Sequence, residues 1–132
     1  MRCVLALIGI LAMCGNAIAA DAPLGRWLTA SGNLVIEIAP CGPMLCGKVV
    51  EIRANRSMEA AGGEVAAKPA LGMMILTDFV SDGGGTWQGH IFDRENGKTY
   101  DCLIRIAGPR ELKVRPYIFV SLIGQTQIWK KV

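Results

Sequence analysis

Two cysteines close together in the sequence are the residues best placed to do chemistry. The chain has 132 residues and five cysteines, of which Cys3 and Cys14 fall in an apolar N-terminal stretch. Cys41 and Cys46 are separated by Gly-Pro-Met-Leu, a segment typical of a turn. In an oxidising compartment this spacing predicts a disulfide, and closing so short a loop contributes only about 2 kcal/mol. A redox-active pair would more often have C-x-x-C spacing at a helix N-terminus.

The fifth cysteine, Cys102, lies in an alternating apolar segment, which predicts a buried free thiol. A zinc site made of Cys41, Cys46, Cys102 and His90 is a formal alternative. It is disfavoured because structural zinc sites usually take closely spaced ligand pairs from both halves of the site. We therefore expect no metal and no cofactor.

His90 is the only histidine, so it is the candidate base for a hydrolase with an activated nucleophile. Asp93 or Asp101 could orient its ring, but no serine occurs in a Gly-x-Ser-x-Gly elbow to act as a nucleophile. Glu37 and Glu51 are a candidate carboxylate pair for glycoside cleavage, yet acidic residues are common on the outer faces of strands. The sequence therefore predicts no catalytic residues and a protein that is not an enzyme.

The N-terminus has the features of a secretion signal. Arg2 precedes an apolar run over 4–13, and 17–19 reads Ala-Ile-Ala, a cleavage pattern. We expect residues 1–19 to be removed and the protein to be periplasmic or secreted. A lipoprotein signal ending at Cys14 is the alternative, but Met13 is larger than the residue such a signal requires.

The remaining chain, residues 20–132, is long enough for a single domain. Without Arg2 it has 13 basic and 11 acidic residues, and the basic ones are scattered along the sequence. Nucleic acid is therefore an unexpected partner, since backbone binding needs a concentrated basic face. The apolar run of the leader is too short to cross a membrane, and we expect no transmembrane segment in the mature chain.

Apolar residues in the mature chain alternate with a period of two, which indicates strands rather than helices. The predicted strands are 25–29, 33–39, 47–52, 73–80, 87–93, 99–106, 111–115, 117–123 and 125–131. Short connections rich in Gly, Asn and Asp favour antiparallel neighbours. We expect an all-β, antiparallel up-and-down barrel of about eight to nine strands, a size that holds packed side chains or one small ligand.

Motifs along the whole mature chain carry a family resemblance. The opening Gly-x-Trp resembles the signature of lipocalins and related calycin barrels. The fuller set resembles a family of small secreted bacterial proteins, domain of unknown function 2147. Its motifs here are Gly25-x-Trp27, Val35-x-Glu37-Ile38, Cys41-x4-Cys46-Gly47-Lys48-Val49, Trp87-x-Gly89, the run 91–100, Leu112-x-Val114-Arg115 and 121–129.

The resemblance implies a lipocalin-like barrel and no established activity. It also implies that Trp27 plugs one end of the barrel under a basic side chain from the last strand, Lys130 or Lys131, with Trp129 nearby. The chain departs from the family in the segment 55–72, so a function of that loop in other members need not carry over.

Barrel geometry predicts that a small apolar or amphipathic molecule binds in the mouth. We expect it to contact apolar strand positions, namely Leu34, Ile36, Ile38, Met73, Ile75 and Phe79. The alternative is a protein-interaction module of the cell envelope that acts through the long loop 53–70.

Overall fold

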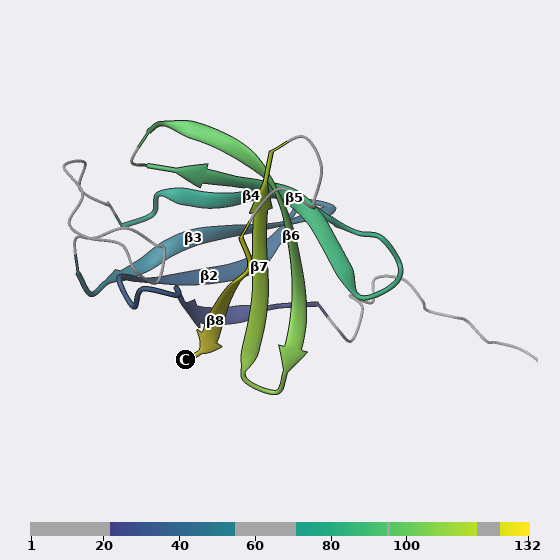
Figure 1. Ribbon diagram of the computed structural model, residues 1–132, viewed down its shortest axis with the longest axis horizontal. Coiled ribbons are helices and arrows are strands. Elements are labelled where there is room, and N and C mark those ends of the chain that lie inside the picture. The colour runs from purple at the N-terminus through teal and green to yellow at the C-terminus, as the bar shows by residue number, and fades with distance from the viewer. Residues whose placement is uncertain (1–21, 55–70, 95, 119–124) are drawn as a thin grey trace, which may run out of the picture.

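The computed structural model describes residues 22–54, 71–94, 96–118 and 125–132. These residues form eight strands and no helix (Figure 1). The strands are β1 (Gly25–Leu28), β2 (Leu34–Cys41), β3 (Met44–Ile52), β4 (Met74–Ser81), β5 (Thr86–Asp93), β6 (Lys98–Gly108), β7 (Glu111–Tyr117) and β8 (Gln127–Lys131).

Each strand pairs antiparallel with the next one, and β1 pairs with β8, so the sheet closes into a barrel. The barrel closes where β1 pairs with β8, with Trp27 opposite Lys131 and Leu28 opposite Lys130. The predicted up-and-down barrel is confirmed. Closure leaves neither terminal strand as an open edge, which removes a template for aggregation.

Several predicted strand boundaries differ from those of the structure. β2 and β3 extend to Cys41 and Met44, which face each other, so the turn between them has two residues instead of four. Gly42 has φ +69°, which suits a tight hairpin turn. β7 also runs through Pro116 to Tyr117.

The ring of Pro116 is tolerated within β7 because the pairing of β7 with β8 ends at Val114. Beyond that point β7 has one unpaired side among the described residues, where a missing N–H costs little. The predicted strand 117–123 lies mostly outside the described residues.

Alternating apolar residues fill the inside of the barrel, as their period of two dictates. Trp27, Phe79 and Trp129 are the largest fully buried side chains. The core cluster is Trp27, Leu34, Ile36, Ile38, Leu45, Val49, Ile75, Leu76, Phe79, Trp87, Ile91, Cys102, Ile104, Leu112, Val114 and Trp129.

β4 is irregular beside Phe79, which lies in the core. The register between β4 and β5 shifts between Thr77 and Val80, and Asp78 has φ +60°, which is rare for a residue with a side chain. The ring of Phe79 packs directly on Gly89 of β5. A Cβ on Gly89 would lie 2.6 Å from Phe79 Cγ and 2.6 Å from the Thr77 carbonyl oxygen.

The strand order defines two barrel ends. At one end, here called the mouth, β3, β5 and β7 finish and β4, β6 and β8 begin. At the other, the closed end, lie the start of β1 and the end of β8, with the β2–β3, β4–β5 and β6–β7 turns. The long loop predicted over 53–70 leaves from the mouth, and its residues 55–70 lie outside the described part.

Candidate functional site

The closed end is sealed by Trp27 and Lys131. The Lys131 ammonium lies 4.6 Å from the centre of the Trp27 ring and donates a hydrogen bond of 2.7 Å to the Leu24 carbonyl. The indole N–H of Trp27 donates to the carbonyl of Pro23 at 3.0 Å. The segment 22–24 is therefore held across this end of the barrel.

Of the two lysines expected to cover the tryptophan, Lys131 does so and Lys130 does not. Successive residues of a strand point to opposite faces, so Lys131 shares the inner face with Trp129 while Lys130 points outward. Lys130 instead pairs with Glu111 at 2.8 Å on the outer wall. Trp129 is fully buried, and its indole N–H donates to the Gln127 side-chain oxygen at 3.0 Å.

The Gly-x-Trp motif has a steric basis in this arrangement. Gly25 has φ +109°, and a Cβ there would lie 2.5 Å from the Lys131 ammonium nitrogen. The ammonium is the tip of a flexible side chain that can move aside, so glycine is required by its backbone conformation. The motif positions the seal of the barrel and no reactive group.

The apolar residues predicted to contact a ligand belong to the core. Leu34, Ile36, Ile38, Ile75 and Phe79 are 0–2% exposed. Met73 is partly buried and packs against the same cluster. A ligand that touched the five buried side chains would first have to displace their close-packed neighbours, which is costly. Of the six, only Met73 retains exposed surface near the mouth.

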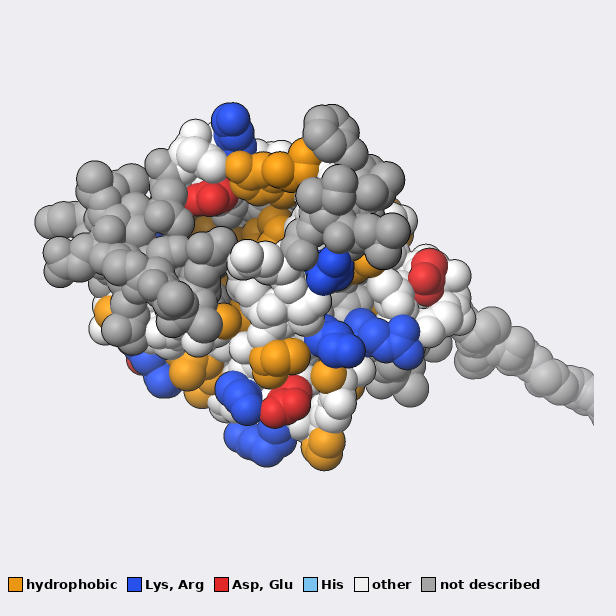
Figure 2. Space-filling model, in the orientation of Figure 1, with side chains coloured by type: hydrophobic (Ala, Val, Ile, Leu, Met, Phe, Trp, Pro, Cys, Tyr) orange, Lys and Arg blue, Asp and Glu red, His pale blue; other side chains and the backbone are white. Residues whose placement is uncertain are grey.

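Other apolar side chains remain open at the mouth. Six large hydrophobic residues are exposed in the described part of the chain, and four of them, Ile52, Leu71, Met74 and Ile118, lie at this end. Tyr100, at the start of β6, is half-buried against the core. Figure 2 shows a hollow with a hydrophobic floor where β4, β5 and β6 come together.

Sequence reasoning missed Ile52 and Tyr100. The signal was available, because Ile52 is the last residue of β3 and pairs with the inward-facing Leu34, while Tyr100 pairs with the inward-facing Ile91. Neither residue was named in the candidate site, because both lie next to a loop, where the alternation that marks inward positions stops.

Polar groups surround the apolar surface of the mouth. The Tyr100 hydroxyl accepts a hydrogen bond of 2.8 Å from the Asn96 amide. Arg94, directly after β5, is 7% exposed, so a cationic side chain is buried at this end. Apolar surface with a few polar groups beside it is the usual composition of a small-molecule site.

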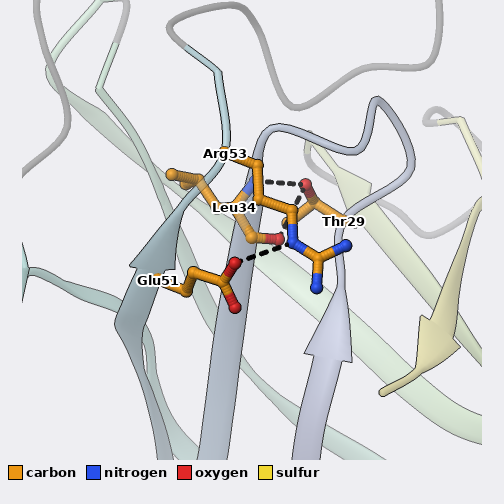
Figure 3. A network of polar contacts seen from close by, with 4 residues as sticks. All are labelled: Thr29, Leu34, Glu51 and Arg53. Atoms are coloured by element: carbon orange, nitrogen blue, oxygen red, sulfur yellow. Dashed lines mark hydrogen bonds and ion pairs between the residues drawn. The ribbon is translucent and has the colours of Figure 1, made fainter.

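A second polar network holds the turn from β1 to β2 at the mouth (Figure 3). The Thr29 hydroxyl accepts the Leu34 N–H at 3.2 Å and bonds to Asn33. The Asn33 carbonyl in turn accepts the Arg53 N–H at 2.8 Å, and the Arg53 guanidinium pairs with Glu51 at 3.0 Å. This network ties the end of β3 to the start of β2, so one rim of the mouth is rigid.

His90 lies on the outer wall, away from the mouth. Its Nδ1 is 3.2 Å from Asp78 Oδ2 and its Nε2 is 3.5 Å from Asp101 Oδ1. The structure thus brings His90 to Asp101, one of its two predicted partners. The ring and both carboxylates are about half exposed.

Glu37 and Glu51, considered as a carboxylate pair, are engaged separately. Glu37 pairs with Arg26 at 3.3 Å and Glu51 with Arg53 at 3.0 Å. Each carboxylate has its own cationic partner, so the pair has the character of two surface salt bridges.

The cysteines have the predicted states. Cys41 and Cys46 form a disulfide across the β2–β3 hairpin at the closed end. Cys102 is free and fully buried opposite Gly89. Burial raises the pKa of its thiol well above the ordinary value, against a smaller lowering by a backbone hydrogen bond at Arg115. A thiol held neutral is a poor nucleophile and metal ligand.

Within the described residues, no group of three or more His, Cys, Asp and Glu side chains is arranged to hold a metal ion. The same part of the chain has no helix of the length and apolarity that crossing a membrane requires.

Comparisons with known proteins give one match. Neither the curated proteins nor the solved structures include one that matches this chain. A family model described as an uncharacterized protein conserved in bacteria, DUF2147, matches residues 25–131. Because that match includes all eight strands, the chain belongs to the bacterial family DUF2147.

Proposed function

We propose that the protein is an exported binding protein that takes a small amphipathic molecule at the mouth of its barrel. The observation that carries this proposal is the position of the exposed apolar side chains, four of which gather at the mouth. An amphipathic ligand would cover this surface and direct its polar part toward the polar groups beside it.

The binding surface in this proposal is shallower than the one expected from sequence. Ile52 and Ile118 would contact the ligand, with Met73 and Tyr100 at its lower boundary. Met74 pairs with the outward-facing Lys48 and lies on the outer wall beside this surface. The buried residues Leu34, Ile36, Ile38, Ile75 and Phe79 would support this surface from below. A shallow site fits an eight-stranded barrel whose interior is occupied by its own side chains.

Export to the periplasm or the medium is part of the proposal. Its support is the Cys41–Cys46 disulfide, because such bonds persist in oxidising compartments and are rare in the cytosol. The leader 1–19 lies outside the described residues. Intact-mass measurement of protein from the envelope fraction tests the cleavage after Ala19, and a diacylglycerol on Cys14 would overturn it.

We propose binding rather than catalysis because His90, the one histidine, is on the outer wall and not at the mouth. His90→Ala should therefore leave ligand binding unchanged. A hydrolytic activity of the purified protein that disappears in this variant would contradict the proposal.

Fluorescence titration with 1-anilinonaphthalene-8-sulfonate, an amphipathic probe, tests the site. Ile52 is 40% exposed, so Ile52→Ser should remove apolar contact worth about 1 kcal/mol and weaken binding roughly five-fold. Val80→Ser is the matched control, since Val80 is 47% exposed at the closed end of β4. Equal affinities for the wild type and both variants would place the probe elsewhere and refute the site.

The second candidate is a protein-interaction module acting through loop 53–70. Ile52 and Leu71 favour it, because exposed apolar residues flank the segment on both sides and Leu71 is 67% exposed. Replacement of 55–70 by a Gly-Ser linker separates the two functions. If the loop is the functional element, cross-linking to an envelope protein is lost while probe binding at the mouth persists.

A further inference from the structure

The outer face of β6, β7 and β8 has an unusual charge distribution. The segments 98–117 and 127–131, which contain these strands and the β6–β7 turn, have two Asp and Glu residues and seven Lys and Arg residues, of which Lys131 faces inward. The described residues between 25 and 93 have three Lys and Arg residues and five Asp and Glu residues. In sequence the basic residues are scattered, but folding collects them on one wall. Figure 2 shows Lys and Arg side chains over the lower part of this wall.

Cations on this wall face one another across the strands. Arg105 of β6 lies directly opposite Lys113 of β7. The row of paired residues across the strands continues to Thr86 of β5 on one side and to Ile128 of β8 on the other. The row therefore contains two cations and no carboxylate. Like charges directly opposite in a sheet are destabilising, so this pairing works against the stability of the isolated barrel.

The opposite wall shows how the same barrel arranges charges elsewhere. There the register places Arg26 of β1, Glu37 of β2 and Lys48 of β3 in one row with alternating signs. Arg53 likewise pairs with Glu51. Compensation is thus available in this fold and is absent from the row of Arg105 and Lys113.

The neighbouring positions extend the basic surface. Arg115 follows Lys113 on the same face of β7 and lies opposite Leu103. Arg110 lies in the β6–β7 turn, and Lys130 projects from β8 beside its partner Glu111. Leu103 and Ile128, half-buried and outward-facing, lie among these cations. We call the set Arg105, Arg110, Lys113, Arg115 and Lys130 the basic wall.

The shape of the basic wall distinguishes among anionic partners. Strands in a sheet are about 4.8 Å apart and alternate residues on one strand are about 7 Å apart, so the cations spread over a surface instead of converging on one point. The outside of a closed barrel is convex, which turns the side chains apart. One small anion cannot contact them all, whereas an array of phosphates can. The apolar Leu103 and Ile128 further favour a headgroup layer over a fully hydrated polymer.

We propose that the basic wall docks the protein onto an anionic phospholipid surface. This inference concerns a different face from the mouth and does not depend on ligand binding there. Each Lys or Arg near such a surface contributes about 1 kcal/mol, which corresponds to about a five-fold change in affinity. Docking by these residues would be sensitive to salt, since all of them except Arg115 are solvent-exposed.

Co-sedimentation with vesicles tests the proposal. The purified protein is mixed with vesicles of phosphatidylcholine alone or with 30% phosphatidylglycerol, a composition chosen as about a third anionic lipid. We expect binding to the anionic vesicles only, and its loss at high salt. The double variant Arg105→Gln/Lys113→Gln should lower the partition coefficient about 25-fold.

A matched control separates the basic wall from net charge. Lys48→Gln/Arg53→Gln removes two exposed cations from β3 and the residue after it, across the barrel from β7, and should change partitioning less than two-fold. Thermal unfolding of both variants verifies the fold. An equal loss in both doubles, or equal binding to neutral vesicles, overturns the proposal. Displacement by inorganic phosphate at constant ionic strength would also overturn it, because free phosphate would then be the anion recognised.

Discussion

Lys131→Met should destabilise the barrel by about 2 kcal/mol, because this lysine makes two interactions at the closed end. Its ammonium donates to the Leu24 carbonyl at 2.7 Å and lies 4.6 Å from the Trp27 ring centre. A hydrogen bond from a charged donor is worth about 1.5–3 kcal/mol. A cation–π contact adds about 0.5–1 kcal/mol at a partly exposed site, and the two are not additive because one ammonium makes both.

Methionine keeps most of the apolar stem of Lys131, so the substitution removes mainly the charge and the donor. The Leu24 carbonyl loses its partner, and the segment 22–24 should loosen over Trp27. Urea unfolding at pH 7 measures the effect, and in a domain of this size 2 kcal/mol corresponds to a fall in Tm of about 8 °C. An increase in the acrylamide quenching of tryptophan fluorescence that is absent in a Trp27→Phe background would report the loosening directly.

Lys130→Met is the control, since it makes the same chemical change one residue away. Lys130 pairs with Glu111 on the surface, where the two side chains are 59% and 44% exposed. Exposed pairs contribute little, and we expect a change within about 0.5 kcal/mol. If the two methionine variants lose the same stability, the inward position of Lys131 has no energetic role and the account of the closed end fails.

Two other predictions concern the core. Gly89→Ala should cost about 2–3 kcal/mol, because its Cβ would meet Phe79 and a backbone carbonyl at 2.6 Å. Gly108→Ala is the control, because a Cβ there meets nothing within 4 Å, and it should change the free energy of unfolding by no more than about 0.5 kcal/mol in the same urea titration. Equal losses in the two alanine variants would refute the packing argument. The raised pKa of Cys102 predicts a pH effect on stability. Above about pH 8.5 the thiol ionises in the unfolded chain but stays protonated in the folded one. The free energy of unfolding should therefore fall as the pH rises, by about 1.4 kcal/mol per pH unit. Cys102→Ala should flatten that slope between pH 8.5 and 10, and an unchanged slope would assign it to other groups.

The strands and their faces follow from local sequence. Leu34, Ile36 and Ile38 alternate with polar or smaller residues, and a strand exposes alternate residues to opposite sides whatever its neighbours are. The Cys41–Cys46 disulfide was equally predictable, because the two cysteines flank a Gly-Pro turn that brings them together. Both depend only on residues close in the chain.

Other features of the structure depend on how segments far apart in the sequence pair with one another. Whether Lys130 or Lys131 covers Trp27 depends on the register of β8 against β1, and a shift of one residue would exchange their faces. Alternation puts Ile75 and Phe79 on one face of β4, but the burial of Leu76 beside Ile75 depends on the irregular pairing of this strand, which no alternation pattern reveals. The basic wall exists only because β6 pairs with β7 so that Arg105 meets Lys113. Sequence thus determined which residues share a face within each strand. Closure of the barrel determined which face is inward and which residues meet, since that is set by the packing of all eight strands at once.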